Sequence, residues 1–158
     1  MNFDLTIWTV RIACMLYVGA LLAWRFTKPQ AAKACWTMGL AAYLAHVVAA
    51  FAYRHSWSHE AAWLETARQT SALFGLDWGG GLWFNYVFTL VWLFDAAWLW
   101  IRPESYRLRT RAVSIPIHAF MAFMFFNGAV VFASGWVRWL GAAATATLIL
   151  LHALRPRR

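Results

Sequence analysis

Charged residues, cysteines and catalytic motifs are all scarce in this chain of 158 residues. Only 13% of the residues are charged and 63% are hydrophobic, against roughly 25% and 45–50% in soluble globular domains. A soluble domain of this length could not bury so much apolar surface, whereas a bilayer can. The two cysteines, Cys14 and Cys35, lie in separate apolar segments at different expected depths, which argues against a disulfide.

Familiar catalytic signatures are missing as well. The chain has no G-x-x-x-x-G-K-[ST], C-x-x-C or G-x-S-x-G sequence, the spacings used by phosphate-binding loops, thiol redox sites and serine-hydrolase elbows. Five histidines and six acidic residues are too few for a di-metal membrane oxygenase. The sequence therefore favours a protein that is not an enzyme.

What the chain does contain is five long apolar segments, at residues 5–26, 31–53, 82–101, 112–133 and 136–154. Each approaches the roughly 20 residues that cross a hydrocarbon core, and each must be helical because lipid offers backbone groups no partner. We therefore predict an all-α fold, with residues 1–158 forming a single membrane domain of five transmembrane helices. Only Ser134 and Gly135 separate the last two segments. A four-span alternative, with one of these two along the interface, stays open.

The net charge of +8 follows the predicted spans. Ten lysines and arginines fall in the gaps after the first, third and fifth segments, whereas only Arg54, Arg68 and Arg138 fall on the other side. The positive-inside rule then predicts a multi-pass cell (inner) membrane protein with its N-terminus outside and its C-terminus in the cytoplasm. Because the basic residues flank apolar segments, we expect a lipid bilayer and no nucleic acid as partner.

Residues 56–81 form the one sizeable segment outside the predicted spans. Ser56 or Ser58 can cap a helix, and Glu60 suits its first turn. Apolar residues at helical spacing predict a short interfacial amphipathic helix. We expect the run Gly79-Gly80-Gly81 to end it and return the chain to the membrane.

Small residues at four-residue spacing predict close helix packing within the spans. The second segment offers Ala41, Ala45 and Ala49, and the fifth offers Gly141 and Thr145. Packing within one chain is the simpler interpretation, and a homo-oligomer contact is the alternative.

Two ionisable residues are expected at one depth near the cytoplasmic side. Asp95 lies seven residues before Arg102, and His118 lies seven residues after Arg111, so both sit roughly 10 Å inside their spans. This pair predicts either a structural hydrogen bond or a proton relay. A contact of Asp95 with Arg25 or Arg102 is the alternative.

A second polar group is expected in the outer half, where Arg11, His46, Asn85 and Asn127 lie. Alanines at helical spacing leave the face of His46 open, with room for haem b, a quinone or another helix. His46 and His118 lie at different depths, so they are poorly placed to ligate one haem together. Bonding among these residues in a packed bundle is the simpler interpretation.

His55 and His59 stand four residues apart and Glu60 follows, which makes a weak candidate metal site. Ser56-Trp57-Ser58 is expected to break the helix between the two histidines, so solvated side chains are the better interpretation. The arrangement also departs from H-E-x-x-H, because the glutamate follows the second histidine.

These patterns lead to three hypotheses of function. The first is an accessory or interaction subunit of a membrane complex, packed against other membrane subunits. The second is a small proton-coupled transporter that uses Asp95, His118, Arg11 and His46. The third is a membrane redox protein that binds haem or quinone near His46.

Overall fold

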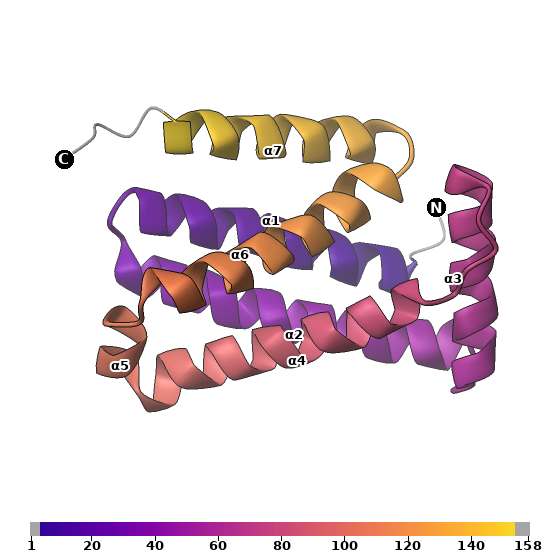
Figure 1. Cartoon of the computed structure of the whole chain (residues 1–158), viewed down its shortest axis with the longest axis horizontal. Coiled ribbons are helices and arrows are strands. Elements are labelled where there is room, and N and C mark those ends of the chain that lie inside the picture. Colours follow the sequence, from indigo (N-terminus) through magenta and orange to yellow (C-terminus); the bar gives the residue numbers. More distant parts are fainter. Residues whose placement is uncertain (1–3, 154–158) are drawn as a thin grey trace.

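The computed structural model describes residues 4–153, and all regular structure in that range is helical. The elements are α1 (Leu5–Arg25), α2 (Pro29–Tyr53), α3 (His59–Phe74), α4 (Gly81–Ile101), α5 (Pro103–Arg107), α6 (Arg111–Phe126), the π-helical turn η1 (Asn127–Val131) and α7 (Trp136–Ala153). The helices α1, α2, α4, α6 and α7 run roughly along the long axis in alternating directions, with α3 across one end and α5 at the other (Figure 1). These ends are named the α3 end and the α5 end below.

Four helices are long and apolar enough to cross a membrane: α1, α2, α4 and the continuous helix Arg111–Val131 formed by α6 and η1. They confirm the all-helical prediction and four of the five predicted segments, and they indicate a small multi-pass membrane protein in contact with a lipid bilayer. The segment predicted at 136–154 is the shorter apolar helix α7. Leu154, its predicted last residue, lies outside the described residues.

Helix α3 confirms the helix predicted between the second and third segments, with one correction. The Ser58 side chain accepts a hydrogen bond from the Ala61 amide and caps the start, and Glu60 occupies the first turn. The helix ends earlier than expected, because Gly75 takes the left-handed conformation (φ 70°) that closes its last turn. The prediction that the glycine run ends α3 is therefore wrong.

The glycine run instead lets the chain pass close to α3. A Cβ atom at Gly79 would lie 2.6 Å from the backbone oxygen of Trp63, closer than any side chain tolerates. Gly79 and Gly80 are both buried, and α4 begins directly afterwards at Gly81. These residues therefore hold the start of α4 against α3.

The core is an aromatic cluster between α1, α2, α4 and α6. Trp36, Trp92 and Met121 are fully buried, and Tyr17 stacks on Phe125 with ring centroids 3.6 Å apart. A Cβ atom at Gly39 would lie 3.1 Å from the Trp92 ring, so this glycine admits the indole to the face of α2.

The small-residue prediction for the second segment holds only in part. Ala49 is buried, but Ala41 and Ala45 are exposed. The buried face of α2 is built around Trp36, Gly39 and Tyr43 instead, because an aromatic core needs large side chains with gaps between them.

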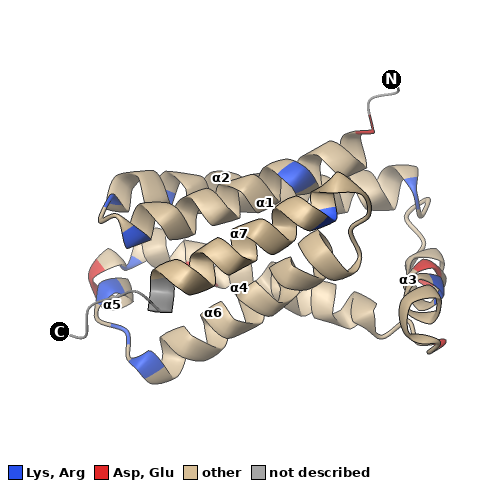
Figure 2. Ribbon diagram, turned by 90° about the horizontal axis from the view of Figure 1, so that it is seen from above, with Lys and Arg blue, Asp and Glu red and all other residues tan. Residues whose placement is uncertain are grey.

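Most of the basic residues lie at the α5 end, whereas the acidic residues of α3 lie at the opposite end (Figure 2). This distribution is the one on which the orientation in the membrane was predicted. The orientation itself, with the N-terminus outside, stays a prediction.

Candidate functional site

At the α5 end, Arg109 contacts both Asp95 and His118, the two residues that the sequence predicted to lie at one depth in the membrane. Asp95 of α4 is 2% exposed, and its Oδ1 atom lies 2.5 Å from Nη1 of Arg109. Nη2 of the same guanidinium lies 2.8 Å from Nε2 of His118 on α6. Asp95 and His118 thus meet through a third residue, which the loop between α5 and α6 supplies.

The contact with Arg109 assigns the tautomer of His118. A guanidinium only donates hydrogen bonds, so Nε2 of His118 accepts and Nδ1 carries the proton. This Nδ1 atom is buried without a hydrogen-bond partner among residues 4–153, as are the indole nitrogens of Trp36 and Trp92. The ring of His118 lies against Trp36 and Trp24, with ring centroids 6.1 and 6.2 Å away.

Tyr106 of α5 completes this network. Its hydroxyl donates to Oδ2 of Asp95 over 3.0 Å, and the Arg109 guanidinium lies 4.0 Å from the centre of its ring. Burial, followed by the neighbouring Asp95 carboxylate, raises the pKa of Tyr106, against an opposing effect of Arg109. The phenol therefore stays protonated and keeps donating, so both carboxylate oxygens are bonded.

Sequence reasoning missed Tyr106 and Arg109. The signal that could have found Arg109 was the need of a buried carboxylate for a cation, together with the arginines that follow α4. The sequence offered Arg25 or Arg102 only as the alternative partner of Asp95. Arg25 instead donates to the backbone oxygen of Leu151 in α7, 3.2 Å away.

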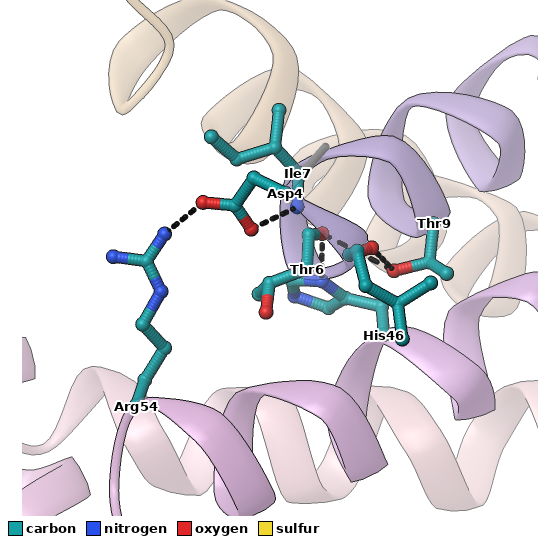
Figure 3. A network of polar contacts seen from close by, with 7 residues as sticks. Asp4, Thr6, Ile7, Thr9, His46 and Arg54 are labelled. Carbon is teal, nitrogen blue, oxygen red and sulfur yellow. Dashed lines mark hydrogen bonds and ion pairs between the residues drawn. The ribbon is translucent and has the colours of Figure 1, made fainter. Parts of the chain in front are cut away.

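At the α3 end, His46 and Asn85 line a pocket of about 680 Å³ between α2, α3 and α4. Nδ1 of His46 lies 2.9 Å from the backbone oxygen of Thr6 in α1 (Figure 3). A carbonyl oxygen can only accept, so Nδ1 carries the proton and Nε2 keeps its lone pair. Nε2 makes no hydrogen bond within the described part of the chain, so it is free to accept one from a ligand.

A polar clasp holds α1 in place over His46. The Asp4 carboxylate caps α1 by accepting from the Ile7 amide over 3.3 Å, and it pairs with Arg54 just beyond the end of α2 (Figure 3). The clasp joins the ends of α1 and α2 and fixes the Thr6 carbonyl that orients the imidazole.

The other two residues of the predicted outer group lie apart from this pocket. Arg11 sits between the indoles of Trp8 and Trp136, 5.2 Å from each ring centre. Asn127 donates to the backbone oxygen of Phe123 in its own helix. The expected group is therefore split, because only His46 and Asn85 face α3.

The weak metal hypothesis gains no support from the geometry. Ser56 and Trp57 adopt φ of 48° and 59° and separate His55 from His59, as expected. Nδ1 of His59 lies 3.0 Å from the Tyr86 hydroxyl. No group of three His, Cys, Asp or Glu residues that could hold a metal ion, Glu60 included, occurs within residues 4–153. Cys14 and Cys35 are free thiols, as predicted.

Comparison with known proteins adds no family to this description. No family model, no curated protein and no solved structure matches the chain. The class that the fold supports is a small multi-pass helical membrane protein, and its function has to be argued from the two polar sites.

Proposed function

We propose that this protein binds a quinol in the pocket at the α3 end, as a subunit of a larger membrane complex. The observation that carries the proposal is the orientation of His46. Its Nδ1–H is held by the Thr6 carbonyl, which leaves Nε2 as an acceptor in a pocket with room for a ligand. A quinol is a lipid-soluble ring whose hydroxyls need such an acceptor.

The lining of the pocket suits a flat ring that carries polar substituents. Val47, Phe51 and Leu82 offer apolar surface, whereas Asn85 and Thr89 offer polar groups. Sites for small molecules combine these two features, with a few placed polar groups fixing the orientation. The lining includes Thr6 of α1 as well as residues of α2 and α4, so the pocket borders three of the candidate spans. A ligand dissolved in the bilayer would therefore lie close to it.

The role of a subunit follows from the chemistry of the ligand. Oxidation of a quinol requires an electron acceptor, which another chain of a complex would have to provide. Binding is therefore the function proposed here, and turnover belongs to the complex. This combines the first and third hypotheses drawn from the sequence.

The core favours this reading over a proton-coupled carrier. A layer of aromatic rings lies between the two polar sites. The ring centroids of Tyr43 and Trp92 are 5.7 Å apart, and those of Trp92 and Trp36 are 5.4 Å apart. Asp95 is bonded at both oxygens. An aromatic layer beside a carboxylate that is bonded at both oxygens is the arrangement of a structural support.

The test is equilibrium binding of a short-chain quinol to the purified protein in lipid nanodiscs, read by tryptophan fluorescence. His46→Leu removes the acceptor, and we expect affinity to fall about tenfold, the effect of about 1.4 kcal/mol for one hydrogen bond. His46→Gln restores an acceptor oxygen and should recover part of the loss.

His59→Gln is the matched control, because His59 is exposed and does not line the pocket, and an amide can still bond to the Tyr86 hydroxyl. It should bind the quinol as the wild type does. Equal affinity of the wild type and His46→Leu, or no saturable binding at all, would refute the proposal.

Haem is the second candidate, favoured by the same hydrogen bond. Histidines that ligate a metal commonly donate their other ring nitrogen to a carbonyl, and Arg54 and Arg68 line the pocket where propionates would need cations. Added haem should then give a Soret band that His46→Leu abolishes. A band that persists in this variant would exclude His46 as the ligand.

A further inference from the structure

Helices α1 and α7 touch near both of their ends and leave a groove in between. Near the α3 end, the Arg11 guanidinium lies 5.2 Å from the Trp136 ring. Near the α5 end, Arg25 donates to the Leu151 carbonyl over 3.2 Å. The two helices lie side by side in both overall views (Figures 1 and 2). A cavity of about 710 Å³ separates them, and α6 with η1 forms its third wall.

The groove is apolar along almost its whole length. Val18, Leu21, Phe125, Leu140 and Leu148 are among the side chains that line it. Lining residues extend from Trp136 to Ile149 along α7, which is roughly 20 Å of helix. Half of a bilayer core is about 15 Å thick, so the groove has the length of one acyl chain.

Arg11 supplies a charge at the end of this groove where α1 begins. Side chains on a helix tilt toward its N-terminus, and the contact with Trp8, one turn earlier, shows that the guanidinium follows this direction. Within residues 4–153 it makes no hydrogen bond or ion pair. The nearest acid along α1, Asp4, is already occupied by Arg54 and the Ile7 amide.

We propose that this groove binds an anionic phospholipid, with one acyl chain between α1 and α7 and the phosphate on Arg11. Two indole contacts alone leave the hydrogen-bond donors of Arg11 unused, which is costly for a cation inside a membrane helix, and a phosphate offers a guanidinium two parallel charge-assisted hydrogen bonds. The charge therefore selects the headgroup, and the apolar walls accept the chain. This site is separate from the quinol pocket and does not depend on it.

Native mass spectrometry in a neutral detergent tests the proposal, with dioleoyl phosphatidylglycerol and dioleoyl phosphatidylcholine as probes. The two lipids have the same chains and differ in headgroup charge. We expect one phosphatidylglycerol per protein, bound at least tenfold more tightly than phosphatidylcholine. Arg11→Gln should remove this preference, whereas Arg68→Gln, which removes an exposed charge on α3, should preserve it.

A second pair of variants tests the chain-binding part of the groove. Gly128 lines the groove, and a Cβ atom there would meet nothing within 4 Å. Gly128→Leu should fill the space and lower the affinity for both lipids at least tenfold. Ala41→Leu, on the exposed face of α2, should leave both affinities unchanged.

Three results would overturn the proposal. Equal affinity for the two lipids would remove the role of Arg11. Unchanged binding to Gly128→Leu would place the lipid elsewhere. A dimer that persists in excess lipid and that Gly128→Leu dissolves would show that a second copy of this chain occupies the groove.

Discussion

The guanidinium of Arg109 holds α4, α5 and α6 together through Asp95, Tyr106 and His118. The Arg109 side chain is 7% exposed and that of Asp95 only 1%, so neither charge has water to replace its partner. We expect Arg109→Gln to lower the free energy of unfolding by about 3 kcal/mol, because it leaves a buried carboxylate without a cation. Thermal unfolding in detergent, followed by circular dichroism, measures the effect.

The same loop provides the control for this prediction. Arg107 is two residues away but has a side chain that is 76% exposed, with Glu104 as its partner. An exposed pair of this kind contributes little, so Arg107→Gln should unfold like the wild type. Equal unfolding temperatures for the two variants would mean that Asp95 does not depend on Arg109.

Depth along a helix was enough to predict that Asp95 and His118 lie close together, because it follows from residue numbers and the rise per residue alone. It could not identify Arg109. The loop holds several arginines, and only the fold of α5, which turns Tyr106 inward, decides which one faces the carboxylate. The same reasoning grouped Arg11 with His46, because depth carries no information on which side of its own helix each residue faces.

Among the elements, α7 depends on one close approach. A Cβ atom on Gly141 would collide with the backbone oxygen of Ala129 in η1, whereas one on Gly128 would meet nothing within 4 Å. We expect Gly141→Ala to destabilise the protein by about 1–3 kcal/mol, the usual effect of overpacking. Gly128→Ala makes the same chemical change and should be neutral or slightly stabilising.

The unfolding temperatures of the two alanine variants, measured together, test this difference in stability. Cysteine cross-linking between α7 and η1 shows whether α7 has moved. A Gly141→Ala protein as stable as Gly128→Ala would show that α7 packs loosely. The sequence did indicate Gly141 as a packing residue. It could not tell that Ala41 and Ala45 differ from it, since spacing alone does not reveal which helix face meets a neighbour.

Helix boundaries also differ in whether the sequence alone could predict them. The cap at Ser58 was predictable because it depends on residues three apart in the chain. The role of Gly79 was not, because it depends on Trp63, which α3 brings close only in the folded protein. Local chemistry is readable from the sequence, whereas close approaches between distant segments are not.

For the whole molecule, the open question is whether α7 crosses the membrane. It meets α1 at Arg11 and again at Arg25, contacts that lie about 14 residues apart on each helix, or roughly 21 Å. A helix lying along the interface at the α3 end could not reach the residue that ends α1. We therefore predict that α7 crosses as a fifth span, so that α1 begins and α7 ends on opposite sides of the membrane.

Reporter fusions at each terminus test this expectation. With five crossings, a C-terminal fluorescent protein is active in the cytoplasm, and an N-terminal tag is reached by a protease added from outside. A fusion after Arg107 should report the same side as the C-terminal fusion, because Arg107 and the last turn of α7 lie at the α5 end, which carries most of the positive charge (Figure 2). If the C-terminus instead shared the side of the N-terminus, α7 would not cross. The groove between α1 and α7 would then not run alongside the acyl chains of the bilayer.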